Sequence, residues 1–202
     1  MARGKGTRAG LYREDVIGAA HDILVLEGFR SLTMRRVADV LGVAPNALYS
    51  HVIDRDDLAD SVLDLELAKV RIPDAGTTQN RVELAMRVLW STLVAKPGLA
   101  THFLSRTDWG GECARLGREI VDVFRKAAPT ADRAPEHMGA LLAYTIGSAA
   151  MAGPMGLDTA DRMFREGLSV FLLGLELEPA PGRFAVRRDW PEIADTIDPR
   201  TV

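Results

Sequence analysis

The sequence lacks most of the residues on which a covalent framework or an enzyme active site would depend. Its single cysteine, Cys113, cannot form a disulfide within the chain, which agrees with a reducing, cytoplasmic compartment. Cys113 falls on an apolar helical face, and this favours a buried thiol over a redox sensor. The motifs of zinc proteases, α/β-hydrolases and phosphate-binding loops do not occur. We therefore expect no enzyme activity, no metal site and no cofactor.

A strong excess of positive charge is also missing, because the net charge is −3. The charge is unevenly distributed: residues 1–55 carry a net charge of +2, whereas residues 56–202 carry −5. Arg3, Lys5 and Arg8 precede the first acidic residue and form a basic arm. This asymmetry is typical of a nucleic-acid-binding head attached to a neutral body.

The N-terminus has no apolar segment of the kind found in signal peptides. One uncharged run of 20 residues, Met138–Leu157, is long enough to span a bilayer. The run contains Pro154 and four glycines, and no basic or aromatic belt flanks it. We therefore expect it to form a buried or interface helix rather than a membrane span.

Strand patterns are nearly absent, whereas apolar residues recur at helical spacing along most of the chain. Thr33 is a natural N-cap, Gly42 a natural helix stop, and Pro45 suits the first turn of a helix. We predict an all-α fold of about nine helices, with a three-helix head at 1–55 and a larger C-terminal helical bundle at 56–202. The expected helices cover about Leu11–Glu27, Met34–Leu41, Pro45–His51, Asp54 or Asp56 to Val70, Asn80–Lys96, a short segment after Pro97, Gly111–Lys126, Pro135–Ala152 and Thr159–Glu176.

The most informative stretch is Leu32–Leu58. Two short predicted helices are joined there by a tight turn at Gly42, which is the arrangement of a helix-turn-helix. In such a motif the second helix can enter the major groove of DNA. Small and apolar residues are placed to pack the two helices together, namely Val37, Ala38, Leu41, Val43 and Leu48.

This stretch resembles the DNA-binding head of the tetracycline-repressor (TetR) family. The matching pattern is Gly28-Phe29, Leu32-Thr33-Met34-Arg35, Val37-Ala38, Leu41-Gly42-Val43, Leu48-Tyr49, His51-Val52 and Asp57-Leu58. The resemblance implies a DNA-binding transcription regulator. It further implies a repressor that binds a palindromic operator as a homodimer and is released by a small-molecule effector.

The resemblance also implies roles for single residues. Arg35 is expected to reach a base edge, where arginine pairs with guanine, and Asn46 and Ala47 to meet an adenine and a thymine methyl group. Phosphate contacts are implied for Thr33, Tyr49, His51 and Arg55. The full set expected at DNA is Thr33, Arg35, Pro45, Asn46, Ala47, Tyr49, Ser50, His51 and Arg55. Two alternatives stay open: Tyr49 as a core aromatic, and the pair Arg35 and Arg36 as a solvated face.

The last two long helices are expected to form the homodimer interface. The first is rich in small residues, which let helices approach closely, and the second has a bulky apolar stripe. In the family the corresponding helices form a four-helix bundle between subunits, so the resemblance agrees. The expected interface residues are Ala143, Gly147, Ala150, Leu168, Phe171, Leu172 and Leu175. The alternative is that both are plain core helices.

A pocket for a largely apolar effector is expected where side chains are larger or more polar than an ordinary helical core requires. For His102 and Asp108 a surface position is favoured over the alternative of a polar anchor in the pocket. The large side chains expected to line the pocket are Met86, Trp90, Phe103, Trp109, Met138, Tyr144, Met151 and Met155. Each is also typical of an ordinary helical core. A second functional hypothesis is a helical ligand-binding dimer without sequence-specific DNA binding. Arg35, Tyr49, His51 and the basic arm favour DNA binding over that alternative.

Overall fold

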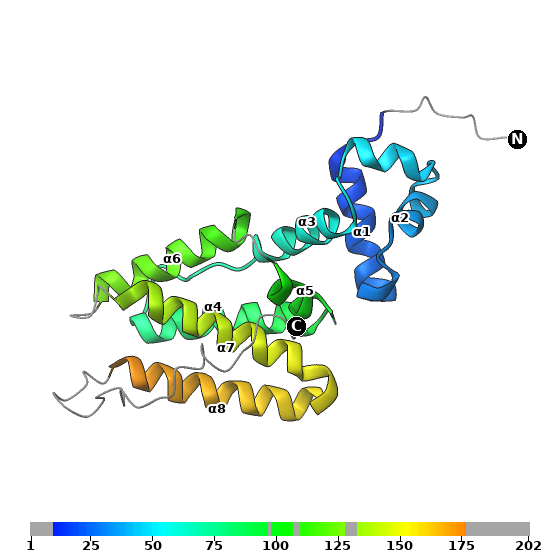
Figure 1. Cartoon of the computed structure of the whole chain (residues 1–202). Coiled ribbons are helices and arrows are strands. Elements are labelled where there is room, and N and C mark those ends of the chain that lie inside the picture. Colours follow the sequence, from blue (N-terminus) through cyan, green and yellow to red (C-terminus); the bar gives the residue numbers. More distant parts are fainter. Residues whose placement is uncertain (1–9, 97, 107–109, 128–132, 177–202) are drawn as a thin grey trace, which may run out of the picture.

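The computed structural model describes residues 10–96, 98–106, 110–127 and 133–176, with the backbone alone at 127, 175 and 176. Within these ranges the chain forms eight α-helices and two short 3-10 helices, without a strand (Figure 1). In chain order they are α1 (Arg13–Glu27), η1 (Phe29–Ser31), α2 (Met34–Leu41), η2 (Pro45–Ser50), α3 (Arg55–Leu67), α4 (Thr78–Val94), α5 (Leu99–Ser105), α6 (Gly111–Ala127), α7 (Ala134–Met155) and α8 (Leu157–Glu176). The predicted all-α fold is confirmed.

The helices form a small head and a larger body (Figure 1). The head contains α1, η1, α2 and η2, and the body contains α4 to α8. In the body, α7 packs against α4, α5, α6 and α8. Helix α3 packs against α1 of the head and also against α5 and α6 of the body. It is therefore the helix through which the two parts are connected.

The helix ends follow from the residues predicted to cap them. The Thr33 hydroxyl accepts a hydrogen bond of 3.2 Å from the backbone N–H of Arg36, which satisfies a free donor in the first turn of α2. The Asp54 carboxylate accepts bonds of 2.9 Å from two backbone N–H groups at the start of α3. Gly42 ends α2 with a φ of +65°, a conformation that favours glycine.

Most helix ends differ from the sequence prediction by one to three residues, among them the C-terminal ends of η2 and α7. The third helix, η2, is a 3-10 helix and ends at Ser50 rather than at the predicted His51. Helix α7 continues to Met155, beyond the predicted end at Ala152, because Pro154 lies in its last turn and removes only one N–H there. Within the described residues, no helix is long and apolar enough to cross a bilayer.

A close backbone approach joins the head to the body beside α5. Gly98, which precedes α5, has a φ of +95°, and a Cβ atom built on it would lie 2.6 Å from the Cβ of Phe29. The Phe29 ring in turn packs at 5.4 Å from the His102 ring of α5. Only glycine therefore lets η1 of the head lie this close to the body.

A buried carboxylate makes a second link between the two parts. Glu66 of α3 is 1% exposed, and its oxygens lie 2.6 Å from Lys69 Nζ, 3.0 Å from Lys96 Nζ and 2.7 Å from His21 Nε2. Burial raises the pKa of Glu66, but hydrogen bonds from Lys69 and Lys96 outweigh that effect and hold the pKa below its ordinary value. Glu66 thus remains an anion that joins α1 of the head to Lys96 at the end of α4.

We predict that Gly98→Ala lowers the free energy of unfolding by about 1–3 kcal/mol, because alanine is strained at this φ and its methyl group overlaps Phe29. Urea denaturation followed by circular dichroism measures the loss. Gly18→Ala in α1 is the matched control, since its methyl group would meet no heavy atom within 4 Å. The control should gain about 0.5–1 kcal/mol. Equal effects of the two substitutions would contradict the close approach at Gly98.

Candidate functional site

The helix-turn-helix consists of α2 and η2, joined by the turn at Gly42. The backbone N–H of Val43 donates to the Ala38 carbonyl at 3.1 Å, which folds the turn back on α2. In η2, Leu48 is fully buried and fixes this short helix on the head core. The remaining side chains of η2 are exposed, and Tyr49 is 54% exposed. The predicted DNA contacts on η2, Pro45, Asn46, Ala47, Tyr49 and Ser50, therefore all lie at the surface.

The start of α2 adds two further predicted residues to this surface. Thr33 and Arg35 are both exposed. The Thr33 oxygen accepts the capping bond from Arg36, so its hydroxyl proton remains available to a phosphate. Arg35 has no ion pair or hydrogen bond to any part of the chain that the structure describes. Its guanidinium is therefore free to bind a ligand outside the chain.

Arg36 differs from its neighbour because it is paired. Its Nε atom lies 3.0 and 3.1 Å from the two carboxylate oxygens of Glu27 at the end of α1. This hydrogen bonding lowers the pKa of Glu27 and raises the pKa of Arg36. For Arg36, the pairing with Glu27 favours the alternative of a solvated face over a contact with DNA.

Arg55, a predicted phosphate contact, has hydrogen-bond partners within the head. Its Nε donates to the Leu32 carbonyl at 2.7 Å and one terminal nitrogen donates to the Phe29 carbonyl at 3.3 Å. The guanidinium carbon also lies 4.7 Å from the centre of the Phe29 ring. Arg55 therefore holds the loop between α1 and α2 in place. Spacing alone did not reveal this role, because the carbonyl acceptors lie more than twenty residues earlier in the chain.

Arg13 is a positioning residue that sequence reasoning did not select. Its guanidinium donates to the His51 carbonyl, and also to Ser61 Oγ at 2.7 Å. It lies 3.4 Å from the Asp57 carboxylate as well. Arg13 thereby ties the end of η2 to α1 and α3. His51, a predicted phosphate contact, is half-buried at this position.

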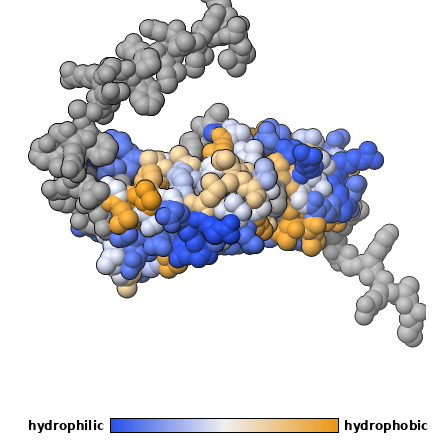
Figure 2. All heavy atoms as spheres, turned by 90° about the horizontal axis from the view of Figure 1, so that it is seen from below, coloured by the Kyte–Doolittle hydropathy of each residue, from blue (hydrophilic) through white to orange (hydrophobic). Residues whose placement is uncertain are grey.

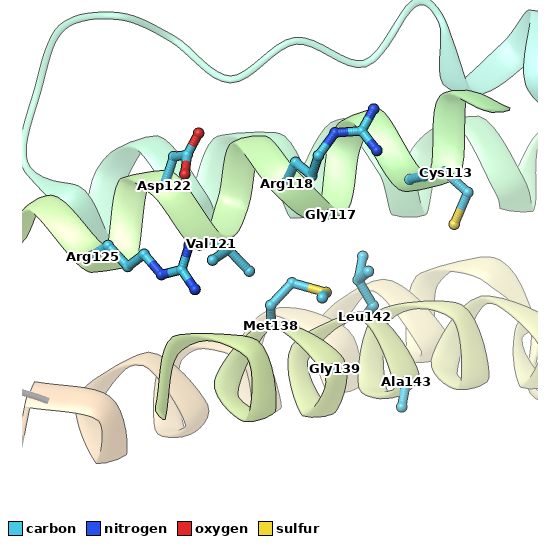
Figure 3. Close-up of a pocket in the computed structure, with 11 residues that line it drawn as sticks. Cys113, Gly117, Arg118, Val121, Asp122, Arg125, Met138, Gly139, Leu142 and Ala143 are labelled. Atoms are coloured by element: carbon cyan, nitrogen blue, oxygen red, sulfur yellow. The ribbon is translucent and has the colours of Figure 1, made fainter. Parts of the chain in front are cut away.

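The body contains a cavity of about 730 Å³ between α6 and α7 (Figure 3). Most of its walls are apolar or small side chains, with three charged residues from α6. It is lined by Cys113, Ala114, Gly117, Arg118, Val121, Asp122, Arg125, Met138, Gly139, Leu142 and Ala143. Burial raises the pKa of the Cys113 thiol to about 11, so this side chain is neutral at physiological pH. Its burial confirms the prediction from its apolar helical face.

Of the eight predicted pocket residues, Met138 lines this cavity. Met86 and Phe103 are fully buried, and Met151 is exposed. Trp90 stacks on Phe164 of α8 with ring centres 5.0 Å apart. Trp109 and Asp108 lie outside the described residues.

Other polar groups among these predictions are used within the chain. The Tyr144 hydroxyl donates to the carbonyls of Met163 and Phe164 at 3.0 and 3.1 Å. His102 Nε2 lies 2.8 Å from the Asp60 carboxylate of α3. Met155 is half-buried at the end of α7. The large side chains singled out in the sequence thus mostly build the core, and the cavity forms where α6 and α7 carry glycine instead.

The predicted interface residues differ in exposure: some lie at or near the surface, and others are buried within the chain. Ala143 is exposed and also lines the α6/α7 cavity, and Gly147 and Ala150 are half-buried. Leu168 and Leu172, only 1% and 2% exposed, pack within the chain. Phe171 is half-buried, and the side chain of Leu175 lies outside the described residues.

The exposed apolar face of α8 is formed by other residues. They are Met163, Val170 and Leu173, each more than half exposed. Figure 2, which views the molecule from the side of α8, shows hydrophobic and weakly polar residues on this face beside strongly hydrophilic ones. Helical periodicity identified the stronger stripe of α8, and that stripe is the one that packs against α4 and α7.

Comparison with known proteins agrees with the geometry of the head. The profile of the family described as "Bacterial regulatory proteins, tetR family" matches residues 16–62, from α1 into α3. An HTH-type transcriptional regulator of Saccharopolyspora erythraea is 37% identical over 67 residues, which cover 33% of this chain and 28% of that protein. The chain thus matches less than a third of the length of this curated relative.

Solved structures match over most of the chain. Apo ActR from Streptomyces coelicolor superimposes with a TM-score of 0.73 at 24% identity, over 84% of this chain and 96% of ActR. BioQ from Mycobacterium smegmatis superimposes with a TM-score of 0.71 at 25% identity, over 82% of this chain and 98% of BioQ. ActR is described as a TetR family protein and has been solved in complex with (S)-DNPA and with actinorhodin. BioQ has been solved with its double-stranded DNA operator.

We predict that Arg55→Ala lowers the free energy of unfolding by about 1–3 kcal/mol, because two carbonyls and the Phe29 ring lose their partner. Arg35→Ala removes the same charge from the same head and should change stability by less than about 0.5 kcal/mol. Chemical denaturation of the two variants beside the wild type measures both values. An Arg55→Ala variant as stable as Arg35→Ala would restore Arg55 to the set of free phosphate contacts.

Proposed function

We propose that this chain, whose residues 16–62 match the tetR family of bacterial regulatory proteins, is a ligand-responsive repressor that binds a palindromic operator as a homodimer. The observation that carries the proposal is the exposed surface of the helix-turn-helix. Arg35 on α2 and Asn46 and Tyr49 on η2 are exposed, and buried Leu48 fixes η2 on the head core. We propose a regulator rather than an enzyme, because the matched family consists of regulatory proteins.

Each exposed side chain suits a different part of DNA. Arginine donates a planar pair of N–H groups, which matches the two acceptors of guanine in the major groove, and asparagine matches adenine. We assign these roles to Arg35 and Asn46. Thr33 and Tyr49 carry hydroxyl groups at the edges of the motif and are assigned to phosphates, which set the register without reading the sequence. The operator complex of BioQ, which has the same fold, supports this use of the head.

We propose a homodimer because a single recognition surface contacts too few base pairs for useful specificity. Two heads related by a two-fold axis read two half-sites, which is how such motifs reach useful specificity. We place the interface on α7 and α8. There Ala143, Gly147 and Ala150 provide a surface of small residues, and Met163 and Val170 provide exposed apolar side chains. Small residues on one helix beside bulky ones on the next suit a close four-helix packing.

The α6/α7 cavity is our candidate for the effector site. Its volume of about 730 Å³ and its largely apolar walls suit a small organic molecule. Two ActR complexes with small molecules support a ligand response in this fold.

A direct connection runs from α6, one wall of this cavity, to the helix that carries the head. Arg115 of α6 donates to the carbonyl of Leu67, the last residue of α3, at 3.1 Å and to that of Val70, three residues beyond it, at 3.0 Å. A ligand that separates α6 from α7 therefore moves the end of α3. In a dimer such a movement changes the distance between the two heads and weakens operator binding.

We predict that selection from random DNA yields a palindromic site, which the protein binds with an affinity that falls steeply with salt. Arg35→Ala should weaken binding by about 1–3 kcal/mol and relax selectivity at one base pair of each half-site. Tyr49→Phe should weaken binding to all sequences alike. Fluorescence anisotropy with labelled duplexes measures these affinities.

The matched control for this experiment is Arg30→Ala. Arg30 is an exposed arginine of the same head that lines a crevice beside Gly98 and His102, on the side of the body. Its removal should leave sequence selectivity unchanged. If selection recovers no site and all duplexes bind equally weakly, operator binding is wrong, and the helical ligand-binding dimer becomes the better hypothesis.

We further predict that Val170→Glu converts the homodimer to a monomer, because it places a charge in an apolar interface. Val170 is 62% exposed within one chain, so the helical fold should be retained. Leu104→Glu on α5, at a residue 49% exposed, is the control outside the proposed interface. Sedimentation equilibrium measures the mass of each variant. A dimer that survives Val170→Glu, or a wild type that is monomeric, would contradict the α7/α8 interface.

A further inference from the structure

We infer that the α6/α7 cavity binds an organic anion with an apolar body, and that Arg125 pairs with the anionic group. The inference rests on the effector response proposed above and adds the chemical class of the effector. It is carried by the shape of the cavity and by the charges that line it.

The apolar part of the cavity lies between two facing helix surfaces. Val121 of α6 points toward Met138 and Leu142 of α7 across the space (Figure 3). Gly117 and Gly139 leave room between these walls. A Cβ built on Gly139 has no heavy atom within 4 Å, and one on Gly117 would meet the end of Met138 at 3.6 Å. The cavity is thus open because these two positions have no side chain.

The charges at the edge of the cavity are unbalanced. Arg118 and Arg125 contribute two positive charges, and Asp122 is the single acidic residue among the lining residues. Neither arginine has an ion pair or hydrogen bond to any described residue. Arg125 reaches from α6 into the space between the helices, whereas the Arg118 guanidinium and the Asp122 carboxylate both point away from α7 (Figure 3). Cys113 adds no negative charge, because its thiol is neutral.

The apolar walls and the charges of the cavity lining favour one class of small molecule over the others. A guanidinium that pairs with no described residue and lies beside apolar walls pairs with a carboxylate or sulfonate through charge-assisted hydrogen bonds. A cationic ligand would meet a net positive edge. A neutral ligand would fill the apolar walls but make no use of Arg125. An apolar molecule with one anionic group satisfies both parts of the lining.

A matched pair of fluorescent probes tests the inference. The probe 8-anilinonaphthalene-1-sulfonate is an apolar anion, and N-phenyl-1-naphthylamine has the same rings without the sulfonate. The purified full chain should bind the sulfonate more tightly than the neutral probe. Arg125→Gln should weaken sulfonate binding by about three- to tenfold and leave the neutral probe unaffected. Lys126→Gln removes the same charge next to the lining and should change neither affinity.

A second variant tests the location of the site without removing a charge. Gly139→Leu places a side chain in the open part of the cavity and should abolish binding of both probes, while Gly18→Leu in α1 should not. Equal weakening of both probes by Arg125→Gln, or no effect on the sulfonate, would overturn the pairing with an anion. Unchanged binding in Gly139→Leu would overturn the site. Loss of the dimer in Gly139→Leu would assign the cavity to a second copy of the chain and overturn the inference as well.

The probe experiment contains no DNA, so its result is separate from that of operator binding. A protein that binds its operator but shows no preference for the sulfonate contradicts the ligand class alone. A protein that prefers the sulfonate through Arg125 but is not released from its operator contradicts the proposed release, and the anion site stands.

Discussion

The packing of α3 against two groups of helices fixes where the head can lie relative to the body. Its residues Leu58, Val62, Leu63 and Leu67 are all fully buried, and the helix contacts α1 on one side and α5 and α6 on the other. At its start, Asp54 caps the helix directly after η2. At and just beyond its end, two carbonyls accept hydrogen bonds from Arg115 of α6. A rigid helix with these two attachments transmits displacement along its axis, and the proposed regulation depends on this property.

The head could be predicted from the sequence because its signals are local. The cap at Thr33, the left-handed glycine at Gly42 and the proline at Pro45 each act within a few residues of their own position. The apolar stripe of α1, including Val16 and Ile23, is buried as its spacing indicated. Side-chain partners could not be predicted in this way. Arg36 turns back to Glu27 and Arg55 to the Phe29 carbonyl, and both pairings exist only once the chain has folded.

The body shows a different limit of sequence reasoning. Periodicity identifies an apolar stripe on a helix, but it does not say which neighbour covers that stripe. On α8 the stripe with Leu168 and Leu172 packs inside the chain, and the weaker face with Val170 remains exposed. Large side chains were expected to line a ligand pocket, yet Trp90 stacks on Phe164 within the core. The cavity exists because Gly117 and Gly139, on facing helices, have no side chains. The sequence shows the two glycines but not the space that they leave.

The contacts between head and body also determine how such regulators can be recombined. Phe29 of the head fits against Gly98 of the body, and His21 of the head shares the Glu66 carboxylate with Lys96. Both contacts join residues that are distant in the chain. A chimera that combines this body with the head of a relative must therefore keep an aromatic residue at Phe29 and a hydrogen-bonding group at His21. Exchange of the head of this chain is thus limited by Phe29 and His21, which lie on the side of α5 and α3.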